Sequence, residues 1–251
     1  MAELDGVRAL VTGGTSGLGR AMAAALAGAG AAVAVTGRSE ERARAAAAEI
    51  GGGAIGMAMD VRSVDAVASG VDAAWSRLGG IDLLVNNAGI GMRTVNPRFL
   101  DEPQPFWDVE PDGFRAVLDT KVTGCFLVAR AVVPRMLRAG GGRVVNISMN
   151  RETMVRAGFV PYGPAGAGVE ALSRVMAADL AGSPVTVNVL LPGGATATGM
   201  VPDDVGPDVR GRLLSPDVMG PPVVWLASPA AAGVHDERIV ATEFEAWRAA
   251  R

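Results

Sequence analysis

The sequence predicts an α/β fold in which helices cover both faces of a doubly wound parallel sheet. Short apolar runs alternate along the chain with alanine-rich helical stretches, the pattern that right-handed strand–helix–strand crossovers produce. A glycine-rich turn follows the first of these runs directly. The 251 residues contain no linker, tandem repeat or low-complexity block, so a single domain is expected over residues 1–251.

Six short runs predict the strands, and most are apolar enough for a sheet that is covered on both faces. They are Arg8–Thr12, Ala32–Thr36, Ile55–Met59, Ile81–Val85, Arg143–Ile147 and Val185–Val189. Helices are expected between them at about 17–30, 39–50, 63–78, 111–139 and 161–182. Two long segments, 89–111 and about 193–215, read as loops after strands, which is where ligands bind in such sheets.

Composition and charge exclude several classes of function. One cysteine, Cys125, and one histidine, His235, leave no set of ligands for a metal centre, so no metal is expected. The net charge of −3 comes without blocks of like charge, which argues against nucleic-acid or membrane partners. The first residues lack the basic-then-apolar pattern of a signal peptide. We therefore expect a soluble, cytoplasmic protein in which Cys125 is a small buried residue and His235 is structural.

The glycine-rich turn spans Thr12–Gly19, with glycines in the spacing Gly-x3-Gly-x-Gly. Glycines let the backbone approach a pyrophosphate, and the N-terminus of the next helix offers free N–H donors and a positive dipole end. A tight turn without a ligand is the alternative, but a place between the first strand and the first helix favours a dinucleotide site. The residues expected to contact the dinucleotide here are Gly13, Thr15, Ser16, Gly17, Leu18 and Gly19.

The end of the second strand indicates which dinucleotide is bound. It carries Arg38 and no carboxylate that would accept hydrogen bonds from the adenosine ribose. A guanidinium is the group expected to hold a 2′-phosphate, so NADP(H) is favoured over NAD(H). The alternative is a solvated arginine at the start of a helix.

Six motifs follow one another along the chain: Thr12–Gly19, Asp60–Val61, Asn86–Gly89, Asn146–Ser148, Tyr162 and Pro192–Gly193. With these motifs, the sequence from about residue 5 to about 240 resembles the short-chain dehydrogenase/reductase family. The resemblance implies a single Rossmann-type domain and assigns cofactor contacts. Asp60 would bond the adenine, with Val61 beside it. Asn87, Ala88 and Gly89 would line the ribose, Pro192 and Gly193 would border the nicotinamide, and Thr196 would offer a hydroxyl to the carboxamide or pyrophosphate.

The catalytic group departs from the family pattern, which usually combines Asn, Ser, Tyr and Lys. Tyr162 stands at the tyrosine position, but Gly166 stands four residues later, where the lysine belongs. Met149 occupies the serine position and Lys121 the asparagine position. Three of the four catalytic positions are therefore changed.

Two substitutions for the lost groups can be proposed from the sequence. Lys121 is the only lysine, and its ammonium is hypothesised to fill the space that Gly166 leaves and to lower the pKa of Tyr162. An ordinary surface lysine is the alternative. Ser148 and Asn150 are the candidate hydrogen-bond donors in place of the serine, although Ser148 would need a bulge to turn it inward.

The expected function is an NADP(H)-dependent oxidoreductase that interconverts an alcohol and a carbonyl on a small organic substrate, under a flap at about 193–215. One alternative is a catalytically silent dinucleotide-binding or structural subunit that partners an active homologue. Another is an enzyme of this fold with non-redox chemistry. The resemblance implies a homodimer or homotetramer, and the silent alternative implies a hetero-oligomer.

Overall fold

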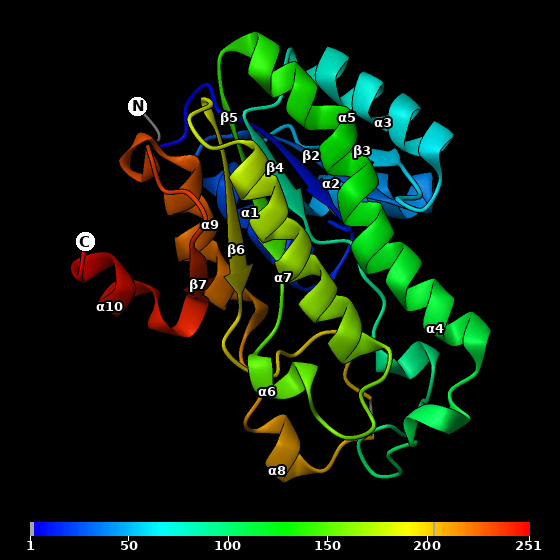
Figure 1. The fold of residues 1–251 in the computed structure, drawn as a ribbon. Coiled ribbons are helices and arrows are strands. Elements are labelled where there is room, and N and C mark those ends of the chain that lie inside the picture. Colours follow the sequence, from blue (N-terminus) through cyan, green and yellow to red (C-terminus); the bar gives the residue numbers. More distant parts are fainter. Residues whose placement is uncertain (1–2, 203) are drawn as a thin grey trace.

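A computed structural model describes residues 3–202 and 204–251. Its seven strands form one parallel sheet in the order β3-β2-β1-β4-β5-β6-β7, which confirms the predicted doubly wound α/β fold (Figure 1). The predicted domain also includes residues 1, 2 and 203, which lie outside the described residues. The strands are β1 (Arg8–Thr12), β2 (Ala32–Gly37), β3 (Ile55–Ala58), β4 (Leu83–Asn86), β5 (Gly142–Ile147), β6 (Val185–Leu191) and β7 (Arg238–Val240).

Helices cover both faces of this sheet (Figure 1). One face is covered by α1 (Gly17–Gly28), α2 (Glu40–Ile50) and α9 (Gly220–Ala227). The other is covered by α3 (Val64–Leu78), α5 (Gly124–Ala139) and α7 (Tyr162–Asp179), with α4 (Pro111–Leu118) running into α5. The short helices α6 (Arg151–Met154) and α8 (Pro207–Arg210) lie beyond the carboxyl ends of the strands, and α10 (Phe244–Ala249) lies near the C-terminus.

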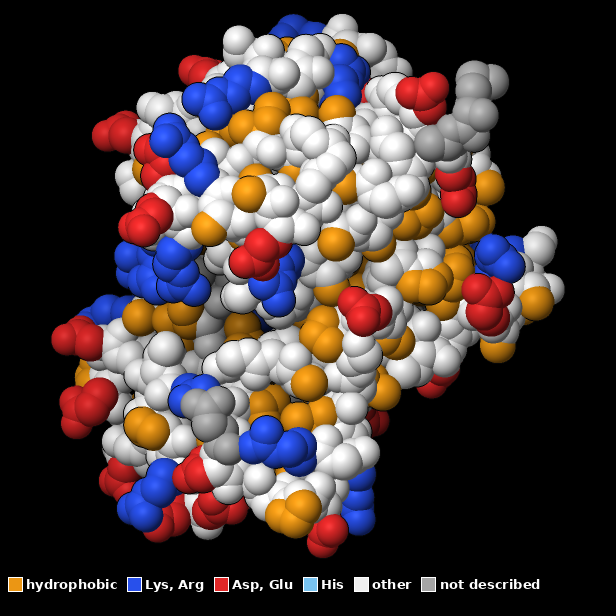
Figure 2. Space-filling view, turned by 180° about the vertical axis from the view of Figure 1, so that it is seen from behind, with side chains coloured by type: hydrophobic (Ala, Val, Ile, Leu, Met, Phe, Trp, Pro, Cys, Tyr) orange, Lys and Arg blue, Asp and Glu red, His pale blue; other side chains and the backbone are white. Residues whose placement is uncertain are grey.

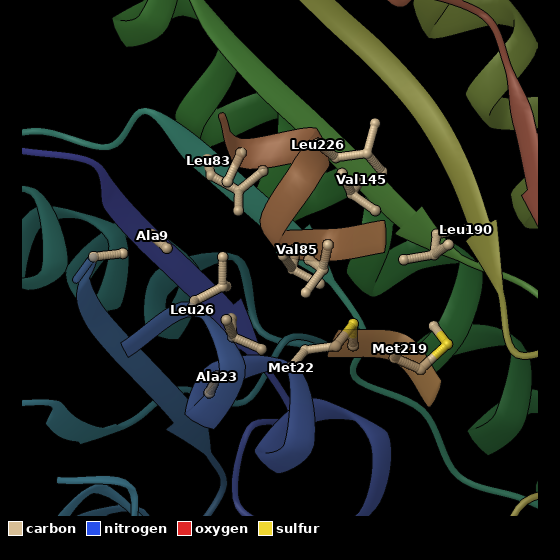
Figure 3. Packing of buried hydrophobic residues seen from close by; sticks show 14 of the residues in the cluster. Ala9, Met22, Ala23, Leu26, Leu83, Val85, Val145, Leu190, Met219 and Leu226 are labelled. Atoms are coloured by element: carbon tan, nitrogen blue, oxygen red, sulfur yellow. The ribbon is translucent and has the colours of Figure 1, made fainter. Parts of the chain in front are cut away.

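Alternate residues along each strand supply the two hydrophobic cores. On one face, Met22 and Leu26 of α1 meet Leu226 of α9 over the strand residues Leu83 and Val85 (Figure 3). The neighbouring residue Leu84 faces the opposite core, with α3 and α5. These side chains are almost completely removed from water. Their burial, at roughly 25 cal/mol per Å² of apolar surface, holds the strand ends in fixed positions.

Two features of the fold differ from the expectations. The seventh strand, β7, was not predicted, because three residues starting with Arg238 are too few to show an alternating pattern. The single helix expected over 111–139 is interrupted by a π-helical turn, Asp119–Thr123, between α4 and α5. The π turn is a single turn between two helices that run on without a break, so a helical pattern over 111–139 does not mark it.

The remaining elements follow the predicted order. The expected loop over 89–111 contains only short 3-10 turns, and the segment after β6 contains α8. His235 is structural, since its ring nitrogens pair with the backbone nitrogen of Val187 and the carbonyl of Ala177. Among the described residues, no helix combines the length and apolar character needed to cross a membrane.

Candidate functional site

The glycine-rich turn is braced by the end of β4. Oγ1 of Thr12 accepts hydrogen bonds from the backbone nitrogens of Asn87 and Ala88, at 3.0 and 3.1 Å. Nδ2 of Asn87 donates to the carbonyls of Thr12 and Gly13, at 3.0 and 3.1 Å. Asn87 was expected to line the ribose, and in the structure its side chain fixes the conformation of the glycine-rich turn. Gly89 follows at the same end of β4.

The turn has the shape of a cradle that only glycines permit. A Cβ at Gly19 would lie 2.3 Å from the carbonyl oxygen of Gly13, and Gly17 has φ +52°. Ser16 precedes α1 in an extended conformation and makes no side-chain cap, so the first N–H groups of α1 lack an intrahelical or capping partner. Thr15 packs against Gly37 at the end of β2. Backbone donors at a helix N-terminus beside bare glycines fit a pyrophosphate.

Two arginines lie at the ends of β2 and β3. Arg38 is exposed, and Arg62 grips Asp60 with Nη2–Oδ2 at 2.6 Å and Nε–Oδ1 at 2.9 Å. The hydrogen bond from Arg62 lowers the pKa of Asp60, and the charge of Arg38 adds to the shift. Val61 is buried against Gly124. Figure 2 shows a hollow on the face opposite to that of Figure 1, with Lys and Arg side chains gathered at one edge.

Tyr162 and Lys121 meet at the start of α7. Nζ of Lys121 lies over the ring of Tyr162, 5.1 Å from its centroid. Lys121 is buried, with 8% of its surface exposed, and it projects from the π turn. Its side chain also lies against Gly89, where a Cβ would come within 3.2 Å of Cγ. The widened turn between α4 and α5 thus carries a buried cation at the carboxyl edge of the sheet.

Burial controls the protonation of both groups. It lowers the pKa of Lys121 to about 8 and raises the pKa of the Tyr162 hydroxyl. The pKa of Tyr162 is thus not lowered overall, contrary to the expectation, because desolvation of the phenolate outweighs the attraction of the neighbouring ammonium in this state. Burial likewise raises the pKa of the neighbouring Cys125 thiol to about 12. At neutral pH the tyrosine is a phenol beside a lysine that is mostly charged.

Met149 fills the space over Gly166. A Cβ at Gly166 would lie 2.6 Å from Cε and 2.9 Å from Sδ of Met149. The hypothesis that the Lys121 ammonium fills this space is thus wrong, because a thioether side chain of similar length already occupies it. Lys121 approaches Tyr162 from the face of its ring instead.

Ser148 and Asn150 are both engaged with protein groups. Oγ of Ser148 donates to Oε1 of Glu170 at 2.8 Å, and Arg238 binds the same oxygen at 2.9 Å. Nη2 of Arg238 also donates to the carbonyl of Met149 at 3.0 Å. Nδ2 of Asn150 donates to the carbonyl of Gly193 at 3.0 Å, which joins the end of β5 to the Pro192–Gly193 turn.

The segment after Gly193 lies over the glycine turn and Tyr162. Thr196 is buried, and its hydroxyl donates to the carbonyl of Gly194 at 3.2 Å. The Thr198 methyl lies close to Gly17, where a Cβ would come within 3.1 Å of it. Sδ of Met200 lies 3.7 Å from Oη of Tyr162.

Nη1 of Arg93 donates to the carbonyls of Gly199 and Val201, at 3.1 and 3.2 Å. The loop after β4 is thus tied to the segment after β6. Asp203, within the predicted flap, lies outside the described residues.

Sequence reasoning placed Met200 in the flap but missed three features of this site: the π turn, the contact of Met200 with Tyr162, and the pair of Glu170 with Arg238. The uniqueness of Lys121 drew attention to that residue, but no sequence signal marked the π turn that carries it. Met200, Glu170 and Arg238 belong to none of the sequence motifs, so no motif indicated their contacts. Among the described residues, no group of three His, Cys, Asp or Glu side chains could hold a metal ion.

Comparison with known proteins places the chain among dehydrogenases. Residues 8–205 match the family model described as short chain dehydrogenase. A 3-oxoacyl-[acyl-carrier-protein] reductase of Vibrio cholerae serotype O1 is 33% identical over 244 residues, covering 94% of this chain and 96% of the relative. The D-threitol dehydrogenase of Mycolicibacterium smegmatis is 35% identical over 249 residues, covering 95% and 92%.

Solved structures resemble the whole chain. A short chain dehydrogenase from Burkholderia cenocepacia in complex with NADP has a TM-score of 0.81 at 30% identity, covering 95% of this chain and 97% of that one. A 3-ketoacyl-(acyl-carrier-protein) reductase from Brucella melitensis complexed with NADH has a TM-score of 0.84 at 30% identity, covering 94% and 97%.

Proposed function

The chain belongs to the short-chain dehydrogenase family and is an oxidoreductase, and on this premise we propose that it reduces a carbonyl group on a small organic substrate with NADP(H). Tyr162 is the proposed proton donor, and Lys121 is proposed to replace the family's usual lysine. The observation that carries this proposal is the position of the Lys121 Nζ over the Tyr162 ring, at 5.1 Å.

The proposed chemistry follows from the protonation of the two side chains. A bound nicotinamide dinucleotide supplies or accepts the hydride of such a reaction. The raised pKa of Tyr162 keeps its hydroxyl protonated at neutral pH, which is the form needed to give a proton to a carbonyl oxygen. As that proton leaves, negative charge develops on Oη, and the Lys121 ammonium stabilises it. Oxidation of the alcohol requires the phenolate and is therefore favoured at alkaline pH.

The changed catalytic positions are part of the proposal. Gly166 and Met149 stand where the family usually has lysine and serine, and Lys121 stands at the asparagine position. We infer that the positive charge beside the tyrosine moved from α7 to the π turn while the apolar Met149 took the vacated space. Nδ2 of Asn150 donates to the carbonyl of Gly193. Asn150 is therefore proposed as a positioning residue, which holds the Pro192–Gly193 turn that would border the nicotinamide. The bond between Ser148 and Glu170 supports a role for Ser148 in holding α7 rather than substrate.

The proposed cofactor site uses the glycine cradle and the basic end of β2. The first N–H groups of α1 would hold the pyrophosphate, and Arg38 would hold the 2′-phosphate of NADP(H). Because Asp60 is paired with Arg62, its carboxylate would meet the adenine as a charge-paired acceptor. The Burkholderia relative was solved with NADP and the Brucella relative with NADH, so the preference proposed here depends on this chain's own residues. Thr196 and Pro192–Gly193 are proposed to border the nicotinamide.

Two coarser features complete the proposal. Residues at about 193–215 act as a flap over the substrate, since Met200 and Thr198 already contact Tyr162 and the glycine turn. We also expect copies of the chain to associate as a homo-oligomer, in which the half-exposed Phe126 of α5 would be covered.

The direct test is a screen of ketones and aldehydes with NADPH, followed by identification of the product and counting of cofactor consumed per product formed. The proposal predicts one NADPH oxidised per alcohol formed. A product formed without cofactor consumption would indicate the non-redox alternative. NADPH binding without turnover on any carbonyl would indicate a silent subunit.

A further inference from the structure

Two methionine side chains lie close to the first turn of α7: Met200 contacts the hydroxyl of Tyr162, and Met149 covers Gly166, four residues further along the helix. Sδ of Met200 lies 3.7 Å from Oη of Tyr162, so this thioether holds the position of a hydrogen-bonding partner. Met200 also fills the space beside Gly91, where a Cβ would come within 3.0 Å of its Cγ. Gly166 lies one turn after Tyr162 on α7, and the side chain of Met149, which follows β5, covers it. Neither thioether offers a hydrogen-bond donor, and sulfur is only a weak acceptor.

Aromatic side chains extend this apolar surface. Phe99 and Phe159 meet edge to face, with ring centroids 5.5 Å apart. Together with Met92 they form a buried cluster, and Tyr162 packs against it. The tyrosine ring is therefore in contact with hydrophobic side chains from the loop after β4 and the segment before α7.

Apart from Lys121 and Tyr162 themselves, the polar side chains described here around this surface have partners within the protein. Ser148 is bound to Glu170, Asn150 to the carbonyl of Gly193, and Arg93 to two carbonyls of the flap. A polar substituent of a substrate placed against Met149 or Met200 would lose its water and gain no more than a weak sulfur acceptor from either side chain. Such loss costs free energy, whereas an apolar substituent in the same place gains it.

We propose that Met149 and Met200 determine substrate specificity, and that they restrict the site to ketones and secondary alcohols with an apolar group near the reacting carbon. This inference rests on the proposed function, because it names the substrate class for the same site. Methionine is flexible and polarisable, so the apolar group can vary in shape while polyols, carboxylates and amides are rejected. The serine position of the family becomes a filter for polarity in this chain.

The test compares two ketones of matched shape, 4-isopropylcyclohexanone and 4-oxocyclohexanecarboxamide. With NADP+ present neither ketone can be reduced, so ligand-observed NMR measures binding alone. The proposal predicts that the isopropyl ketone binds at least about tenfold more tightly, the discrimination expected where a buried polar group stays unpaired. Equal affinities, or tighter binding of the carboxamide, would overturn it.

Variants assign the preference to the methionine. In Met149→Ser the preference is expected to fall to within about threefold, while Met149→Leu, which keeps an apolar side chain, should retain it. Val155→Ser is the matched control for an apolar-to-serine change, because Val155 is 86% exposed and lies outside the cluster. Thermal unfolding establishes that each variant is folded. An unchanged preference in Met149→Ser and in Met200→Ser would contradict the proposal.

Turnover with NADPH separates this inference from the function on which it rests. If neither ketone is reduced although the isopropyl ketone still binds more tightly, the proposed reaction fails and the polarity filter stands. If both ketones are reduced with equal kcat/KM and equal binding, the reaction stands and the filter fails.

Discussion

Nζ of Lys121 lies 5.1 Å from the centre of the Tyr162 ring, at the carboxyl edge of the sheet, and the two residues are the only lysine and the only tyrosine in the chain. The lysine projects from a π turn and the tyrosine opens α7, so the pair depends on how two helices meet. Burial shifts both pKa values toward the uncharged forms. The predictions below follow from this arrangement and from its surroundings.

Replacing Tyr162 with phenylalanine removes the proposed proton donor and leaves the ring beneath Lys121 in place. We expect kcat/KM for carbonyl reduction to fall by about 10²–10⁴-fold, the usual contribution of a positioned acid. NADPH affinity, measured by tryptophan fluorescence, should be unchanged, which controls for folding. Wild-type turnover in Tyr162→Phe would remove the tyrosine from the mechanism.

Lys121 lowers the stability of the folded protein at neutral pH, because its ammonium is buried. Its folded pKa of about 8 lies below the unfolded value of 10.5, so the penalty is complete below pH 8 and disappears as pH rises toward 10.5. Lys121→Met, which keeps the length without the charge, should raise the free energy of unfolding at pH 7 by about 3 kcal/mol. Denaturant unfolding at pH 7 and pH 10.5 measures the difference, which should shrink at the higher pH. A difference that stays constant across this window would contradict the assignment.

Arg38 should distinguish the two dinucleotides. Arg38→Ala is expected to weaken NADPH binding about tenfold or more, equal to about 1.4 kcal/mol, without altering NADH binding. Arg42→Ala, an exposed arginine further along α2, controls for a general loss of positive charge. Isothermal titration of both cofactors measures the effect. Equal losses for NADPH and NADH would show that Arg38 does not contact the 2′-phosphate.

Restoring the family's lysine should fail unless Met149 is also changed. In Gly166→Lys the new side chain meets Met149, whose Cε lies 2.6 Å from the position of the added Cβ. We expect this variant to lose stability and turnover, and the double variant Met149→Ser with Gly166→Lys to recover at least part of both. The two substitutions should therefore be strongly non-additive in a double-mutant cycle. Additive effects on unfolding and on kcat would mean that Met149 does not occupy the lysine's space.

The sheet could be predicted because its strands carry local signals. Arg8–Thr12 was predicted with the bounds that the structure has, since its apolar run ends at the glycine turn. The last strand, Arg238–Val240, could not be predicted, because it owes its conformation to pairing with β6 rather than to its own pattern. Local sequence contains no record of such pairing.

The candidate site could be predicted only in part. The motifs located the glycine turn, Tyr162 and Lys121, and the structure brings the last two together. Which side chain fills the space over Gly166 could not be predicted, because the outcome depends on packing between β5 and α7. Met149 lies there, and its place is reinforced by the bond from Arg238 to its carbonyl.

The most direct test of the account is the pH dependence of kcat/KM for carbonyl reduction in wild type, Lys121→Arg and Lys121→Met. We predict that the wild-type rate falls above about pH 8, where Lys121 loses its charge. Lys121→Arg should keep part of the activity and should not show this fall in rate above about pH 8, because a guanidinium stays charged. Lys121→Met should be at least about tenfold slower at pH 7 and lack the fall near pH 8. A Lys121→Met variant with the wild-type rate and the wild-type pH profile would contradict the claim that Lys121 supports proton transfer by Tyr162.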